Sequence, residues 1–182
     1  FFFNINLDLK NQDFDFILDY LLQNLYEFQE NIHENLNGFI TINFSNMKQD
    51  LFRSGKVKMN LKDSKINILE NSFNIKKIGN FIINTSNFVL KQDQLFFNAD
   101  VKMNIKNKNE FYRLFLVPKE LRFELSEIYF KLEKNLDNNN YVISDLSFNK
   151  KNDSNNENLI KYEFSNIQQL RGVVREVFRL VK

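Results

Sequence analysis

Residues 94–106, QLFFNADVKMNIK, alternate between apolar and polar side chains along almost their whole length. Successive side chains of a strand point to opposite faces, so one face is expected to carry Leu95, Phe97, Ala99, Val101, Met103 and Ile105. At roughly 3.3 Å per residue, such a strand runs about 40 Å. An apolar face of this length needs an apolar partner, which can be a second sheet, a helix or a ligand that is not protein.

The same two-residue period recurs through much of the chain and predicts further strands. They are expected at residues 1–10, 38–45, 55–62, 65–70, 72–77, 80–91, 124–136 and 141–149. The six predicted strands between residues 38 and 106 are joined in series by short connections, which favours an antiparallel meander over parallel pairing. Because the alternation already runs through the first ten residues, the chain is expected to be the C-terminal part of a longer protein.

Three segments follow a helical period instead. An amphipathic helix is expected over residues 13–34, and a short helix over 109–116, ended by Pro118. Residues 149–158, NKKNDSNNEN, are polar throughout and predict a flexible linker. The final segment, 159–182, predicts an amphipathic C-terminal helix, regular from about residue 166.

These elements together predict a single mainly β domain spanning residues 1–182, with sheet and inserted helices over 1–148. The fold class is a long antiparallel meander forming a curved sheet that is apolar on one side. Two interpretations of that side remain open, because a lipid tail and a protein core are equally apolar partners. It can be the core of a closed β-sandwich, or an open groove that receives acyl chains. The groove candidates are Val57, Met59, Leu61, Ile66, Ile68, Leu95, Phe97, Val101, Met103 and Ile105.

The composition offers little material for catalysis. Cysteine is absent, His33 is the single histidine, and the four glycines are isolated, so neither a zinc site nor a glycine-rich phosphate loop is expected. No catalytic residues, metal or cofactor are predicted, and the chain is expected not to be an enzyme. Residues 51–182 carry 23 basic and 15 acidic residues, a net charge of 23 − 15 = +8. This positive charge should attract anionic partners weakly. Nucleic acid is not expected among these partners.

A basic stripe follows the predicted C-terminal helix at about four-residue spacing. It has two interpretations, a solvated helix face or a weak contact with anionic lipid headgroups, each basic residue near such a surface contributing about 1 kcal/mol. The headgroup candidates are Arg171, Arg175, Arg179 and Lys182.

The order of these segments resembles the C-terminal region of AsmA-like proteins, a bacterial family that includes TamB-type and YhdP-type proteins. The resemblance lies in GFITINFSNMKQDLFRSGKVKMNLKDSKINI, FNIKKIGNFIINTSNFVL and QLFFNADVKMNIKNKNEFYRLFLVPKELR, followed by IYFKLEKNLDNNNYVISDLSFN and a terminal helix. It covers residues 35–150 best and rests on strand order and spacing.

The resemblance implies a periplasmic β-groove protein held in the inner membrane of a Gram-negative bacterium by an upstream anchor. Its implied function is non-enzymatic phospholipid transfer between the inner and outer membranes, in support of outer-membrane assembly. The alternative is a closed β-sandwich that serves as a scaffold or interaction module of the cell envelope and has no lipid conduit.

Overall fold

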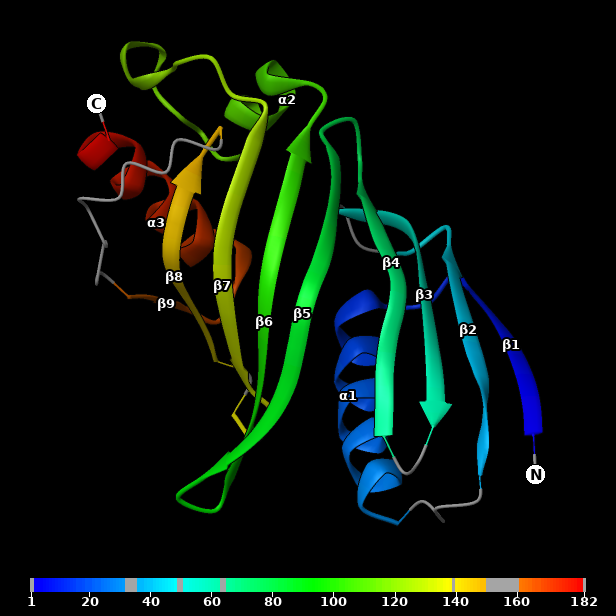
Figure 1. Ribbon diagram of the computed structural model, residues 1–182. Helices are drawn as coiled ribbons and strands as arrows, with labels where there is room; N and C mark the ends of the chain where they lie inside the picture. Colours follow the sequence, from blue (N-terminus) through cyan, green and yellow to red (C-terminus); the bar gives the residue numbers. More distant parts are fainter. Residues whose placement is uncertain are drawn as a thin grey trace. The chain divides into compact units, whose positions relative to one another are not determined.

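A computed structural model describes residues 2–31, 36–48, 51–62, 65–138, 140–149 and 161–181 (Figure 1). Its strands are β1 (Phe2–Lys10), β2 (Asn37–Ser45), β3 (Phe52–Lys62), β4 (Lys65–Ile75), β5 (Gly79–Lys91), β6 (Gln94–Ile105), β7 (Glu127–Asn135), β8 (Tyr141–Phe148) and β9 (Tyr162–Phe164). Its helices are α1 (Phe14–Asn31), α2 (Lys108–Leu114), a single 3₁₀ turn (Lys119–Leu121) and α3 (Ile167–Val181). The expectation of a mainly β chain with an early helix, a short middle helix and a C-terminal helix is therefore confirmed.

Neighbouring strands are hydrogen-bonded in sequence order, from β1 to β9. The sheet is mixed, and its parallel pair includes β1, which lies outside the predicted meander of residues 38–106. β1 pairs with β2 in parallel, from Phe2 opposite Asn37 to Lys10 opposite Ser45. The physical reason is α1, because a helix between two strands supplies the long crossover that parallel pairing requires. The pairs β2–β3, β3–β4, β6–β7, β7–β8 and β8–β9 are antiparallel.

The chain divides into two compact units, where the sequence predicts one domain. The first comprises Phe1–Lys76 and Phe81–Thr85, and the second comprises Lys77–Asn80 and Ser86–Lys182. β5 contributes its central residues to the first unit and both its ends to the second. Each unit is described below by itself.

In the first unit, α1 packs on one face of the strands (Figure 1). Leu21 and Leu25 of α1 contact a buried cluster made of Ile42, Phe44, Met47, Met59 and Phe73. Leu21, Leu22 and Leu25 share one side of α1 at spacings of three and four residues. This stripe explains why α1 lies against the strands.

β4 is one continuous strand, where the sequence predicts two. In its first half the inward side chains have even numbers, Ile66 and Ile68. In its second half they have odd numbers, Phe73 and Ile75. The ladder absorbs this change by a register shift, in which Met59 pairs with Ile68 but Lys58 pairs with Glu70. The shift leaves Leu69 as an extra residue of β4, which is the pattern of a β-bulge.

In the second unit, β5 and β6 form the hairpin that the sequence predicts across residues 91–93. Gln92 and Asp93 both have positive φ, 50° and 61°, as a type I′ turn requires. Inside the hairpin, the rings of Phe88 and Phe97 lie 5.4 Å apart. Along β6, Phe97, Ala99, Val101 and Ile105 are buried, so the predicted alternation is observed.

Side-chain caps fix the starts of α2 and α3. Asn107 accepts a hydrogen bond from the backbone nitrogen of Glu110, and Asn166 accepts one from Gln169. In return, the Gln169 side chain accepts from the backbone nitrogen of Ser165. α3 therefore begins at Ile167, and the expectation of helix from residue 159 is wrong for Tyr162–Phe164, which form β9. The predicted linker 149–158 lies outside the described residues, apart from Asn149.

Candidate functional site

The groove candidates of the first unit lie under or beside α1. Met59 and Leu61 are buried, whereas Val57, Ile66 and Ile68 are partly buried. Val57, Ile66 and Ile68 pack against the same cluster as Leu21 and Leu25 of α1. A helix of this chain therefore occupies the face on which the sequence predicts a groove.

In the second unit, Phe97, Val101 and Ile105 are also buried, and Leu95 and Met103 are partly buried. Met103 pairs with Ile128 of β7, and Ile128 pairs with Phe148 of β8. The Phe148 ring lies 5.3 Å from the ring of Phe178 in α3. This end of the apolar face is therefore covered by α3.

Phe178 is the centre of an aromatic cluster that closes the core of the second unit. It is 1% exposed. Its ring lies 5.0 Å from the ring of Phe123 and 6.1 Å from that of Phe111 in α2. Tyr112 contacts it edge-on at 6.0 Å. Aromatic pairs in this distance range stabilise a core beyond the area they bury.

A buried lysine interrupts the apolar face at its other end. Lys134 of β7 is 1% exposed and pairs with Phe97 on one side and Tyr141 on the other. Its Nζ donates to the Tyr141 hydroxyl over 2.9 Å and lies 4.2 Å from that ring's centroid. The Tyr141 ring in turn stacks on Phe164 of β9. The sequence interpretation missed this residue, although Lys134 continues the two-residue spacing of Ile128, Phe130 and Leu132.

The headgroup candidates on α3 do not form a uniformly solvated stripe. Arg171 is partly buried and donates from Nε to the backbone oxygen of Leu114, at 2.8 Å. Arg175 is also partly buried and donates to the Arg171 backbone oxygen. Arg179 is exposed, and Lys182 lies outside the described residues. Arg171 thus ties α3 to the end of α2.

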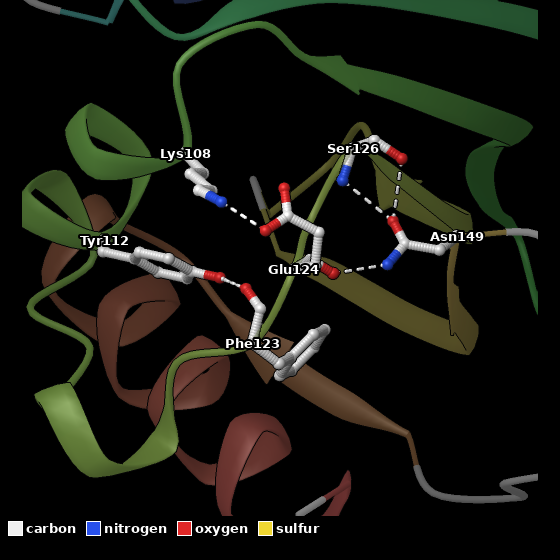
Figure 2. Close-up of polar contacts among 6 residues, drawn as sticks. All are labelled: Lys108, Tyr112, Phe123, Glu124, Ser126 and Asn149. Carbon is white, nitrogen blue, oxygen red and sulfur yellow. Dashed lines mark hydrogen bonds and ion pairs between the residues drawn. The ribbon is translucent and has the colours of Figure 1, made fainter.

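A polar network fastens the segment between the 3₁₀ turn and β7 (Figure 2). The Tyr112 hydroxyl donates to the backbone oxygen of Phe123, and Lys108 forms an ion pair with Glu124. Asn149 accepts from the backbone nitrogen and hydroxyl of Ser126, at 2.8 and 3.0 Å, and donates to the Glu124 backbone oxygen. Backbone groups supply most of these partners, so the network positions a segment. Burial raises the pKa of Tyr112, which keeps its hydroxyl a donor.

Several of the exposed apolar side chains of the first unit lie on β1. Ile5 and Leu7 are each 42% exposed, whereas Ile42, opposite Leu7 on β2, is buried. Phe2 is also exposed, and its ring touches that of Phe39 edge-on. No other described strand lies on the outer side of β1. β1 is therefore an open edge with an apolar face.

Features of other site classes are not found in the described part of the chain. No group of three or more acidic, histidine or cysteine side chains there could hold a metal ion. None of its helices combines the length and apolarity needed to cross a membrane. His33 lies outside the described residues.

Comparison with known proteins adds no relative to this picture. No protein-family model, no curated protein and no solved structure matches the chain.

Proposed function

We propose that this chain is a non-enzymatic interaction module of a bacterial cell-envelope protein, related to the AsmA-like proteins that its segment order resembles. In this proposal its own helices fill the apolar strand faces, and its partner binds elsewhere. The observation that carries the proposal is the burial of the groove candidates. Met59, Leu61, Phe97, Val101 and Ile105 are between 1% and 8% exposed.

An acyl chain and a helix compete for the same surface in this arrangement. In the first unit, Leu21 and Leu25 pack against the cluster that contains Met59. In the second, Phe178 covers the row that contains Met103 and Ile128. A lipid that reached these rows would have to displace a packed helix, with the loss of its buried apolar contacts. This argues for a closed module over a conduit.

Phospholipid handling is the second candidate, and one observation favours it. The apolar face of the first unit continues past α1 onto β1, where Ile5 and Leu7 remain exposed. Acyl chains could lie there if α1 shifted. In this second proposal the chain belongs to a periplasmic groove held in the inner membrane by an upstream anchor, and it contributes to phospholipid transfer between the two membranes.

Single cysteines distinguish the two candidates, because the chain contains no cysteine of its own. We suggest Val101→Cys and Met59→Cys as buried positions, with Leu90→Cys and Leu69→Cys as exposed controls. For a closed module, maleimide should label the buried cysteines on the order of 100-fold more slowly than the controls, because labelling must await opening of the structure. Vesicles of phosphatidylethanolamine and phosphatidylglycerol should not change these rates.

Rapid labelling of Val101→Cys that such vesicles suppress would contradict the closed module and support lipid handling. A photo-crosslinker at Met103 gives an independent readout. Adducts with phospholipid are expected only if the face opens. Mass spectrometry of the purified protein then identifies the lipid class.

A further inference from the structure

Leu116 is exposed in a backbone conformation that leucine rarely adopts. It lies two residues beyond α2 with a φ of 53°, in the left-handed region that favours glycine or asparagine. Its side chain is 58% exposed, whereas those of its neighbours Phe115 and Val117 are buried. The backbone nitrogen of Val117 donates to the Tyr112 oxygen over 2.9 Å, which closes the helix end. A strained and exposed apolar residue of this kind indicates a functional constraint.

Two arginines are held by backbone oxygens that lie on either side of Leu116 in the chain. Arg122 donates from Nε to the oxygen of Val117 over 3.0 Å, and Arg171 of α3 donates from Nε to that of Leu114 over 2.8 Å. Each bond orients a guanidinium and leaves both of its Nη atoms for other acceptors. Within the described part of the chain, neither arginine forms an ion pair with a carboxylate.

Positive charge dominates the segments that carry these arginines. Residues 113–122 contain three basic side chains and one acidic side chain, and α3 has the same ratio. Arg113 is paired with Glu110 at 2.6 Å. Lys119 is exposed and has no ion pair among the described residues. The surface therefore suits an anionic partner, and Leu116 requires that this partner also offer apolar material.

We propose that residues 113–122 dock on the surface of an anionic phospholipid bilayer. Leu116 inserts between the headgroups, and Arg122 and Arg171 bind lipid phosphates. This inference rests on the proposed interaction module and names its partner. A bilayer fits because it combines phosphate oxygens, which arginine binds through two parallel hydrogen bonds, with an apolar layer just below them. An acidic peptide would satisfy the arginines but not Leu116.

The expected adhesion is peripheral and reversible. Each basic residue near an anionic surface strengthens binding by about fivefold, and a single leucine adds only a small apolar area. Salt screens charges that are exposed to solvent, so binding should weaken as the ionic strength rises. Such a contact holds the module against a membrane without opening its apolar strand faces.

Tryptophan at position 116 tests the insertion directly, because the chain contains no tryptophan of its own. Vesicles of phosphatidylcholine and phosphatidylglycerol should shift the emission of Leu116→Trp to shorter wavelength. Vesicles of phosphatidylcholine alone should shift it much less. Leu90→Trp is the matched control, since Leu90 is 60% exposed and lies beside the turn between β5 and β6, at the end of β6 opposite α2 (Figure 1). Its emission should not move.

Sedimentation with the anionic vesicles measures what each group contributes. Leu116→Asn should weaken binding about tenfold, because it removes the inserted apolar side chain. Arg122→Gln should weaken binding about fivefold, as expected for the loss of one cation near an anionic surface. Lys91→Gln, beside the β5–β6 turn, removes the same charge far from the contact and should change binding by less than about twofold.

The stability of Leu116→Asn separates membrane insertion from a structural role. Asparagine adopts positive φ with less strain than leucine, so the variant should unfold at the same urea concentration as the parent chain or at a higher one. A marked loss of stability would show that Leu116 packs within the chain. That result would overturn the inference, whatever its effect on vesicle binding.

Three further outcomes would overturn the inference. The first is an emission of Leu116→Trp that anionic vesicles leave unchanged. The second is equal weakening of vesicle binding by Leu116→Asn and Lys91→Gln. The third is an equally large emission shift with polyglutamate or with inorganic phosphate at the same phosphate concentration, which would assign the arginines to a different anion. None of these outcomes bears on the closed module, which the labelling of Val101→Cys tests separately.

Discussion

Gly79 lies so close to Asn104 that a Cβ built on it would be 1.9 Å from the Asn104 carbonyl oxygen. The start of β5 is held here against the end of β6. The backbone nitrogens of Lys106 and Asn107 both donate to the oxygen of Ile78, at 2.8 and 2.9 Å. The neighbouring atom is part of the backbone, so it cannot move aside as the end of a flexible side chain could.

Gly79→Ala should therefore lower the free energy of unfolding by about 2 kcal/mol or more, because the added methyl forces these strands apart. Gly172→Ala is the matched control, since a Cβ at this position in α3 meets nothing within 4 Å. It should raise the free energy of unfolding by about 0.5–1 kcal/mol, because alanine is the better helix former. Urea denaturation followed by circular dichroism measures both, and equal effects of the two changes would contradict the close contact.

The pair formed by Lys134 and Tyr141 predicts an asymmetry between two substitutions. Tyr141→Phe removes the hydrogen-bond acceptor of a buried ammonium and should cost about 1–3 kcal/mol of stability. Lys134→Met removes the charge but keeps the length of the side chain, so its cost should be smaller. Urea denaturation of the two variants checks the order, with Tyr20→Phe at an exposed ring as the control. If Lys134→Met were the more damaging change, the ammonium would have a stabilising role that the phenol does not explain.

Phe178 should be the most sensitive position of α3. Phe178→Ala deletes a ring that contacts Phe111, Tyr112, Phe123 and Phe148, and should cost about 3–5 kcal/mol. Leu180→Ala, at a residue 61% exposed on the same helix, should change stability by no more than about 0.5 kcal/mol. Thermal unfolding compares the two variants, and similar melting temperatures would show that α3 does not pack as described.

Stability should fall in alkaline solution in a way that depends on Tyr112. Burial raises the pKa of Tyr112 above the ordinary value of 10.0. A raised folded-state pKa means that the neutral phenol is favoured in the folded chain. Its stabilising contribution is therefore complete below about pH 10 and is lost as the pH rises through the folded-state pKa.

Tyr112→Phe should make the decline of stability above about pH 10 shallower, because the phenol that resists ionisation is gone. At neutral pH the same variant should be less stable by about 1 kcal/mol, since its hydroxyl no longer donates to Phe123. Urea denaturation from neutral pH to above about pH 10 measures both the stability loss at neutral pH and the slope of the alkaline decline. Tyr20→Phe serves as the control. If stability declined equally steeply above about pH 10 in the two variants, the raised pKa of Tyr112 would not be the cause of the alkaline loss.

The period of the sequence predicted where strands and helices lie, because that period follows directly from which side chains are buried. The predicted helices 13–34, 109–116 and 166–182 correspond to α1, α2 and α3 within a few residues at each described end. β9 was missed because three residues are too few to show a period. The sequence predicts two strands in place of β4, because a bulge at Leu69 reverses the alternation of apolar and polar side chains. Only the pairing with β3 reveals that the strand continues.

The occupants of the apolar face could not be predicted in the same way. Alternation shows that Val101 and Met59 face an apolar neighbour, but a helix and a lipid satisfy that requirement equally. The role of Lys134 depends on Tyr141, seven residues away across a turn, and so on a register that the sequence alone does not specify. For the same reason, the sequence could not predict that Arg171 donates to the backbone oxygen of Leu114, 57 residues earlier in the chain.

The parallel pairing of β1 has a consequence for the order in which the molecule folds and opens. Every residue of β1 meets a partner 35 positions further along the chain, as Asp8 meets Asn43. An antiparallel hairpin can zip outward from its turn, but β1 must close the whole intervening loop before its first bond forms, and that closure costs entropy. We therefore expect β1 to join last during refolding and to leave first during local opening. Its amides should exchange with deuterium sooner than those of β3.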